Sequence, residues 1–187
     1  MKQELVALLA ERAFKYSDKP IFKLASGKQS CFYINCRPVT LSAKGMNLVG
    51  HLVYQNLRHS GAIAIGGLTF GADPISVATA FASLNTAFSI DAFSIRKQQK
   101  EHGIACWIEG DIPPQSPVVI VDDVATTGAS TITAIERARE EGLNVVKAII
   151  LVDRQEGGLE NIRKYIDDVC AIVTKEELLA TYHALRK

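Results

Sequence analysis

The sequence of 187 residues predicts a single α/β domain with a central parallel sheet of about five strands and helices on its flanks. Short apolar runs carry this prediction, because each has the length of a strand buried on both faces and ends at glycine, an acid or a polar segment. These runs are 62–67 (AIAIGG), 118–123 (VVIVDD) and 145–152 (VVKAIILV). Residues 74–84 and 129–141 have helical periodicity and lie between the runs, and strands that alternate with helices form parallel sheets.

The two ends of the chain extend this pattern. The leucines of MKQELVALLAERAF recur at helical spacing, so a first helix should reach about Phe14. Another helix should follow Ser42, whose hydroxyl suits an N-cap, and should end before Gly61. Residues 169–173 (VCAIV) suit a last strand, and 175–185 (KEELLATYHAL) suit a C-terminal helix. We find no repeat and no linker, so one domain over residues 1–187 is expected.

Composition argues against several classes of protein. The formal net charge is +1 and no block of five like charges occurs, so we expect no nucleic-acid partner. No apolar run approaches the roughly 18 residues of a membrane span, and the N-terminus lacks a signal-peptide core. The cysteines form no CxxC pair and have no histidine at zinc-ligand spacing, so we interpret them as free thiols: Cys31, Cys36, Cys106 and Cys170. We expect a cytoplasmic protein.

The segment VVIVDDVATTGAS, residues 118–130, is the strongest functional signal. Ligands of open α/β sheets bind beyond the carboxyl ends of strands, where Asp122 and Asp123 fall. Their carboxylates can accept hydrogen bonds from the 2′ and 3′ hydroxyls of a ribose, and the turn after them offers backbone N–H groups to a phosphate. The alternative is a helix capped by Thr127 or Ser130 after an exposed acidic turn.

This segment resembles the motif that binds phosphoribosyl pyrophosphate (PRPP) in the type I phosphoribosyltransferases, namely apolar residues, two acids and a turn rich in Thr and Gly. The pattern GxxxxGK[ST] is absent, so a nucleoside-triphosphate P-loop is not expected. The resemblance implies the type I phosphoribosyltransferase fold. It also implies that PRPP is bound by Asp122, Asp123, Val124, Ala125, Thr126, Thr127, Gly128, Ala129 and Ser130.

Residues 94–110, SIRKQQKEHGIACWIEG, resemble the catalytic loop of the orotate phosphoribosyltransferases, which carries the pattern RKxxKxHG. Cations on such a loop stabilise the negative charge that collects on departing pyrophosphate. The resemblance makes Arg96, Lys97, Lys100 and His102 PRPP-binding residues. It makes Lys100 and His102 catalytic, together with Asp122 and Asp123. The alternative is a solvated hairpin whose charges serve solubility.

Three other segments resemble parts of the same enzymes. Residues 22–35 are similar to the segment that covers the base, with Ser26 at its edge and Tyr33 placed to stack on the orotate ring. Arg154 follows the strand 145–152 and could hold the orotate carboxylate, with an ion pair to Asp153 as the alternative. Thr126 completes the predicted orotate site. The pyrophosphate loop is assigned to Gly66, Gly67, Leu68 and Thr69.

The resemblance implies transfer of a phosphoribosyl group from PRPP to N1 of orotate in UMP biosynthesis. Mg²⁺ would arrive with PRPP, and no protein metal site is expected. It also implies a small hood from about residues 1–40 plus C-terminal pieces, and a homodimer whose loops complete the partner's sites. Ala25 and Gly71 stand where many relatives carry lysine. A purine or uracil phosphoribosyltransferase and a PRPP-sensing regulator remain as alternatives.

Overall fold

The computed structural model describes residues 1–23, 29–98 and 106–186. Its centre is a six-stranded sheet with the strand order β10-β9-β8-β5-β6-β7. The strands are β5 (Ala64–Leu68), β6 (Asp91–Ile95), β7 (Ile108–Glu109), β8 (Pro117–Ala125), β9 (Asn144–Asp153) and β10 (Val169–Thr174). The pairs from β10 to β6 are parallel, and the two-residue β7 pairs antiparallel with β6. The predicted α/β fold and its five parallel strands are confirmed.

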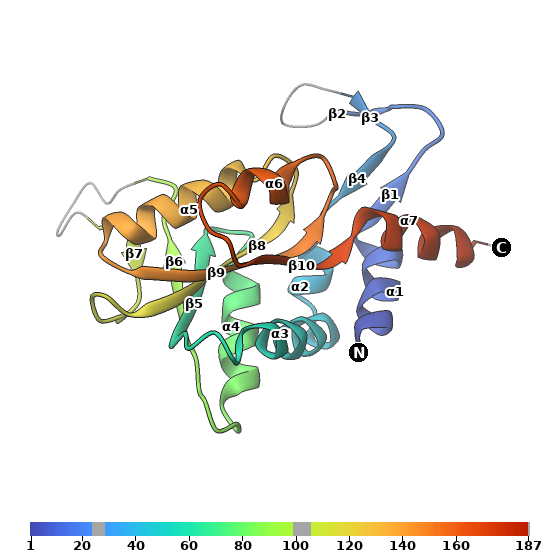
Figure 1. Cartoon of the computed structure of the whole chain (residues 1–187). Coiled ribbons are helices and arrows are strands. Elements are labelled where there is room, and N and C mark those ends of the chain that lie inside the picture. Colours follow the sequence, from blue (N-terminus) through green and yellow to red (C-terminus); the bar gives the residue numbers. More distant parts are fainter. Residues whose placement is uncertain (24–28, 99–105, 187) are drawn as a thin grey trace.

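Helices cover both faces of the sheet because side chains alternate along the strands. In β8, Val118 and Ile120 pack into one apolar core, while Val119 and Val121 pack into the other. The helices of the first core are α5 (Ala129–Glu140) and α6 (Gly158–Ile162). The helices that contribute to the second core are α1 (Lys2–Arg12), α3 (Ala43–Leu57), α4 (Asp73–Ser83) and α7 (Lys175–Ala184). Figure 1 shows α5 and α6 above the sheet and α3 and α4 below it.

Several helix boundaries follow from local chemistry, as the sequence predicts. The Ser42 hydroxyl accepts a hydrogen bond from the Gly45 N–H at 3.1 Å, so Ser42 is the N-cap of α3. In α7, Thr174 and Glu177 form a capping box. The sequence reading missed β6, because the run DAFSI at Asp91–Ile95 is short and interrupted by polar residues. It also missed α6 and the four-residue α2 (Arg37–Thr40).

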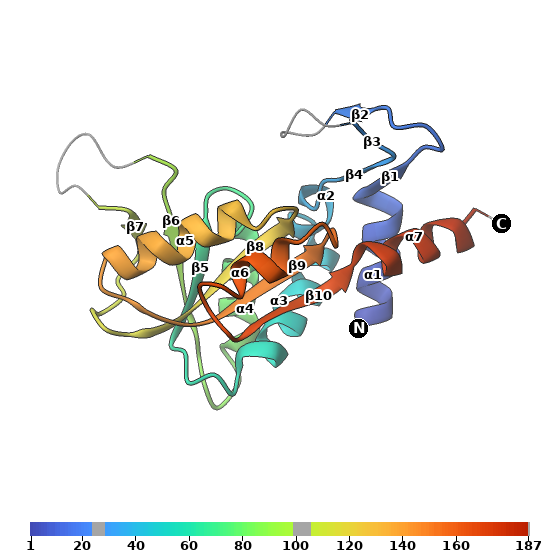
Figure 2. The same ribbon diagram turned by 45° about the horizontal axis from the view of Figure 1, so that its top comes forward.

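The two termini meet beside the β10 edge of the sheet. Helix α1 packs against α7, and two short antiparallel ladders rise from this pair: β1 (Phe14–Tyr16) with β4 (Phe32–Ile34), and β2 (Phe22–Lys23) with β3 (Gln29–Ser30). Figure 2 shows these ladders beyond the carboxyl ends of β8 and β9. Within the described residues no helix combines the length and the apolar character that crossing a membrane requires.

Candidate active site

The acid pair lies inside β8, whose ladder with β9 continues past both acids to Ala125. Asp122 is buried, with 6% of its surface exposed, and accepts hydrogen bonds at 2.9 Å from the Thr131 hydroxyl and from the Asp123 N–H. Asp123 has other neighbours: its carboxylate faces Gly71, and the Cys36 thiol donates to its carbonyl at 3.7 Å. The pair is thus held by three separate segments of the chain.

Burial makes this acid pair hard to ionise. Loss of solvent and, to a lesser extent, the negative charge of Asp123 raise the pKa of Asp122 to about 7, and the Thr131 hydrogen bond opposes both effects. Burial also raises the pKa of Asp123, against the lowering effects of the Val124 N–H and of the Arg37 charge. A ligand that supplies hydroxyl donors, as a ribose does, stabilises the ionised form of carboxylates held in this way.

The turn after β8 presents backbone groups at the start of α5. Gly128 has a φ of +81°, and a Cβ there would lie 2.7 Å from the Gly158 carbonyl oxygen. No side chain caps α5, so the alternative in which Thr127 or Ser130 caps this helix is not what the structure has. Thr127, Ala129 and Ser130 are exposed. The start of this 12-residue helix is therefore accessible to solvent, as an anion site requires.

The predicted pyrophosphate loop lies mostly within β5. Gly66, Gly67 and Leu68 belong to that strand, and the Thr69 N–H donates to the Ile95 carbonyl at 2.8 Å just beyond it. A Cβ at Gly67 would lie 2.1 Å from the Val121 carbonyl oxygen, and one at Gly66 would meet the Phe93 ring. Packing between neighbouring strands is therefore a reason for both glycines, in addition to the phosphate approach that the sequence suggested.

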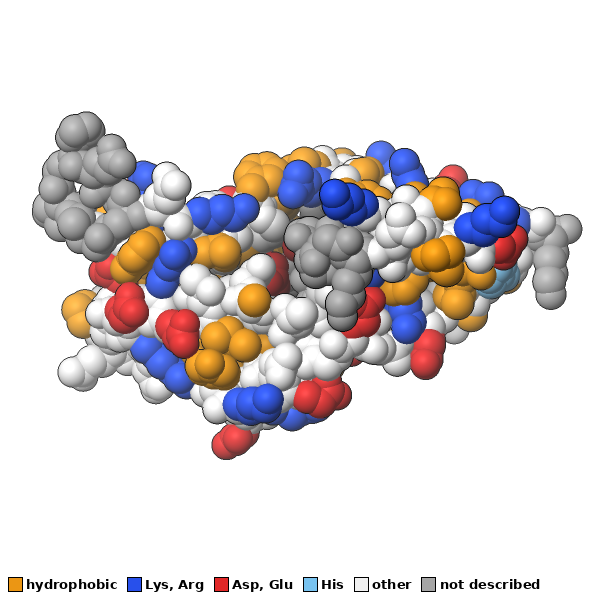
Figure 3. Space-filling view, turned by 90° about the horizontal axis from the view of Figure 1, so that it is seen from above, with side chains coloured by type: hydrophobic (Ala, Val, Ile, Leu, Met, Phe, Trp, Pro, Cys, Tyr) orange, Lys and Arg blue, Asp and Glu red, His pale blue; other side chains and the backbone are white. Residues whose placement is uncertain are grey.

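Cationic groups border an open pocket at the edge of the sheet formed by β6 and β7. Arg96 follows β6 and forms an ion pair with Glu109 of β7. The pocket has a volume of about 690 Å³ and is lined by Thr69, Ser94, Arg96, Lys97, Gln98 and Glu109. Figure 3, which views the molecule from above, shows basic side chains spread over this face. Lys100 and His102 lie outside the described residues.

Arg154 is buried at the end of β9, beside the turn that follows β8. Its N–H donates to the Ala125 carbonyl at 3.0 Å. Its guanidinium donates two hydrogen bonds to Glu156, at 3.1 and 2.9 Å, and lies 4.3 Å from the centre of the Phe32 ring. Asp153 instead accepts from the Gln155 N–H at 2.8 Å, so its pairing with Arg154, the alternative considered from sequence, is not found.

The remaining predicted base contacts are only partly described. Tyr33 is 40% exposed and stacks on Phe22, with 6.2 Å between ring centres. Thr126 is half-buried in the turn after β8, and Ser26 lies outside the described residues. The ladders that carry Tyr33 and the β8 turn lie at the same end of the sheet in Figure 2, and the ring near Arg154 is that of Phe32.

Sequence reasoning missed several residues that hold this site. They are Cys36, Thr131 and Glu156. A local signal existed for Thr131, which is the third residue of the helix that follows the acids and lies in its first turn. Cys36 lies 87 residues from Asp123 along the chain, and no local pattern connects the two.

Comparison with known proteins agrees with this geometry. Residues 62–181 match the model of the phosphoribosyl transferase domain family. The orotate phosphoribosyltransferase of Aquifex aeolicus is 40% identical over 178 residues, which are 95% of this chain and 97% of that protein. The chain belongs to the orotate phosphoribosyltransferases. It is therefore an enzyme of the pentosyltransferase class.

Two further members of this family support the assignment. The orotate phosphoribosyltransferase of Thermosynechococcus vestitus is 45% identical over 159 residues, 84% of this chain and 82% of that one. The crystal structure of the Mycobacterium tuberculosis orotate phosphoribosyltransferase with Fe(III) dicitrate has a TM-score of 0.82 and 30% identity, and covers 95% of this chain and 98% of its own. The predicted type I phosphoribosyltransferase fold is thus confirmed over nearly the whole chain.

Proposed function

We propose that this chain transfers the 5-phosphoribosyl group of PRPP to N1 of orotate, giving orotidine 5′-monophosphate and pyrophosphate for UMP biosynthesis. One observation carries the proposal: the acid pair of β8, in which Asp122 is buried and Asp123 half-buried, and the exposed start of α5 lie beside the buried Arg154 at the end of the neighbouring strand. The acids and the turn suit a sugar phosphate, and the guanidinium suits the carboxylate that distinguishes orotate from uracil.

A solved relative supports PRPP as the donor. The M. tuberculosis enzyme has also been crystallised with PRPP, and that structure has a TM-score of 0.76 and 26% identity to this chain. In this chain, Asp122 and Asp123 would accept from the ribose hydroxyls, while residues 126–130 surround the 5′-phosphate. Arg96, Lys97, Lys100 and His102 would neutralise the departing pyrophosphate. N1 of orotate is the nucleophile, so no covalent protein nucleophile is needed.

Mg²⁺ enters this proposal as a companion of PRPP. Within the described ranges, no three His, Cys, Asp or Glu side chains gather closely enough to form a metal cluster. Mg²⁺ prefers water and phosphate ligands to an all-protein cage, so the pyrophosphate and ribose oxygens of PRPP would hold it. Bound there, the ion would offset charge on pyrophosphate. The cytoplasm remains the expected compartment.

One assay tests the function. Purified chain is mixed with PRPP, Mg²⁺ and one base at a time: orotate, uracil, adenine or hypoxanthine. Of the four bases, we expect only orotate to give pyrophosphate release, and we expect no release after chelation of the metal. Turnover with uracil or a purine in place of orotate would contradict the role of Arg154, and PRPP binding without turnover would favour a regulator.

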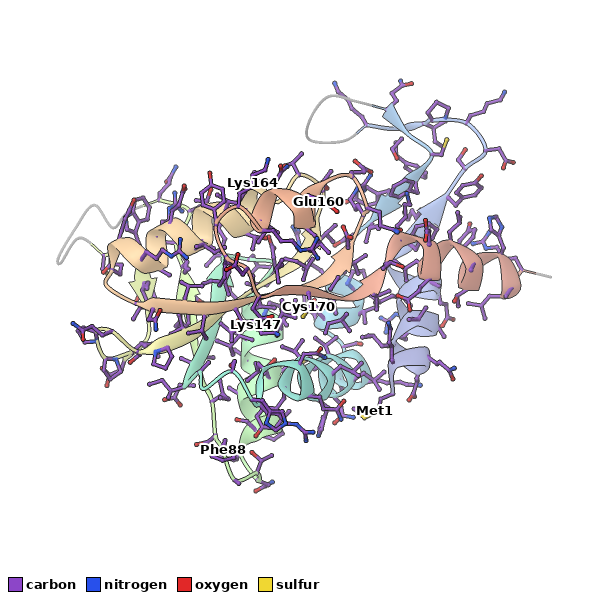
Figure 4. The ribbon with its side chains drawn as sticks, viewed as in Figure 1. Met1, Phe88, Lys147, Glu160, Lys164 and Cys170 are labelled. Carbon is purple, nitrogen blue, oxygen red and sulfur yellow. The ribbon has the colours of Figure 1, made fainter. Side chains whose placement is uncertain are left out.

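A homodimer belongs to the same proposal, and the outer face of α4 supports it. Large apolar side chains that are more than half exposed lie on this helix, at its C-cap and just beyond it: Val77, Phe81, Leu84 and Phe88. Figure 4 shows Phe88 in the loop that follows α4. Such a contiguous apolar stripe marks an interaction surface, and a second copy of this chain is the occupant we propose.

Subunit mixing tests whether the dimer shares its active sites. Lys100→Ala and Asp123→Asn variants, each with strongly reduced activity, are mixed under conditions that let subunits exchange. If the loop acts on the partner's site, half of the dimers are mixed and each has one site without a defect, so activity should return to roughly a quarter of the wild-type value per subunit. If each loop serves its own subunit, the mixture should stay as inactive as its components.

A further inference from the structure

Arg137, which lies outside the site just described, holds the backbone segment that carries the cationic residues of that site, Arg96 and Lys97. Arg137 lies in the last turn of α5 and donates hydrogen bonds to two successive carbonyl oxygens, those of Arg96 at 2.5 Å and Lys97 at 3.2 Å. Its guanidinium carbon also lies 3.9 Å from the centre of the Trp107 ring. A planar guanidinium is suited to this double task, because it forks its donors in one plane and stacks through its face.

The same end of α5 holds the chain on the other side of this segment. The Trp107 N–H donates to the Glu141 carboxylate at 2.8 Å, and the Trp107 carbonyl accepts from the Arg96 N–H, also at 2.8 Å. The sheet offers little help here, since β7 contributes only two residues at the edge. Side chains from α5 are therefore needed to fix where Arg96 and Lys97 lie.

Arg139 provides a comparison that separates the role of Arg137 from that of an ordinary cation at a helix end. Arg139 lies two residues further along α5 and donates one hydrogen bond to the Tyr165 carbonyl at 2.8 Å. Both arginines complement the negative end of the helix dipole. Arg137 alone of these two contacts the segment that lines the pocket, and it does so with two carbonyls and an aromatic ring.

We propose that Arg137 is a positioning residue for PRPP binding and turnover: it holds the Arg96–Lys97 backbone so that both side chains face the pocket before PRPP arrives. Helix α5 begins at the phosphate turn and is about 18 Å long, so one rigid element carries that turn at its start and this contact at its end. The inference rests on the proposed function, because it assigns Arg96 and Lys97 to PRPP.

The test compares Arg137→Ala with Arg139→Ala as its matched control. For each full-length variant, kcat and KM are measured with PRPP varied, and the Kd of PRPP is measured by calorimetry. We expect kcat/KM for PRPP to fall about tenfold in Arg137→Ala, because part of the binding energy must then order the Arg96–Lys97 segment. Arg139→Ala should stay within about twofold of wild type, and Arg137→Lys should recover only part of the loss, because an ammonium cannot reproduce the planar fork.

Two further readouts separate positioning from general stability. Trp107 is the only tryptophan in the sequence, so its emission reports directly on loss of the guanidinium contact. Equal melting temperatures of the two alanine variants would show that the kinetic difference is local. If Arg137→Ala fails to fold, Trp107→Leu removes the stacking partner and should lower kcat/KM in the same direction.

The outcomes separate this inference from the function on which it rests. If Arg137→Ala and Arg139→Ala share the same kinetics and the same PRPP Kd, Arg137 does not position the segment. If the wild-type chain turns over no base but binds PRPP, the proposed transfer to orotate is wrong, and the Kd values still decide the role of Arg137. If the wild-type chain does not bind PRPP, both proposals fail.

Discussion

The acidic and basic sides of the candidate site are held in place by different means. Asp122 and Asp123 lie in β8, which has β9 on one side and β5 on the other, and Asp122 is almost fully buried. Arg96 and Lys97 follow β6 near the edge of the sheet, where the Arg96 side chain is 37% exposed. The sheet itself positions the acids, whereas side chains from α5 position the cations. Ribose contacts are thus preorganised by the core, and the pyrophosphate contacts depend on a few surface interactions.

The largest effect should come from the basic side. Lys100→Ala removes a charge that is needed most as pyrophosphate departs, and loss of one such donor costs about 10²–10³ in kcat. Lys100 lies outside the described residues, so this expectation rests on the RKxxKxHG resemblance. Single-turnover and steady-state kinetics measure it. Normal turnover with only a higher KM for PRPP would show that Lys100 binds substrate without a role in the chemical step.

On the acidic side, Asp122→Asn and Asp123→Asn should each lower kcat/KM for PRPP by about ten- to hundredfold, because each removes a charged acceptor for a ribose hydroxyl. Both variants should fold, since asparagine has nearly the same shape. Circular dichroism provides the control for folding. Kinetics equal to wild type in both variants would remove the acid pair from the active site.

Arg154 follows β9, on the side of the acid pair away from the cations, and its loss should act on the base alone. Arg154→Ala should raise the KM for orotate about tenfold and leave the KM for PRPP nearly unchanged, because one charge-assisted hydrogen-bond pair is lost. The guanidinium is buried against Glu156 and Phe32, so melting curves must accompany the kinetics. A drop in PRPP affinity instead would move Arg154 to the donor site.

The smallest expected effect is on stability, and it sharpens the contrast between the buried acids and the exposed cations. The folded-state pKa of Asp122 is raised to about 7 from its ordinary 3.8, so between these values the native chain binds more protons than the unfolded one. The free energy of unfolding contributed by Asp122 therefore falls as pH rises through this window. Asp122→Asn should be more stable than wild type above pH 7 and should match it near pH 4.

Denaturant unfolding at a series of pH values measures this difference. Asparagine keeps an acceptor for the Thr131 hydroxyl, so that hydrogen bond should survive the change. A variant less stable than wild type at high pH would mean that the buried carboxylate stabilises the fold. Arg96→Gln, on the exposed side, offers a reference that should show no such dependence over the same window.

Much of this protein follows from its sequence alone. Apolar runs, helical spacing and the Ser42 cap predicted the strands and helices of the α/β domain, because each depends on neighbours within a few residues. Local motifs also predicted the acid pair, the turn after it and the family. The strand β6 escaped because its run is short and half polar.

Only the tertiary structure decided how these residues are held. Glu156 as the partner of Arg154, Cys36 behind Asp123 and Arg137 on the Arg96–Lys97 backbone could not be read from any motif. Arg137 and Arg96 are 41 residues apart, and they meet because α5 packs along the sheet toward its β6 edge. Hydrophobic periodicity specifies which face of an element is buried, but side-chain partners across elements depend on how those elements pack.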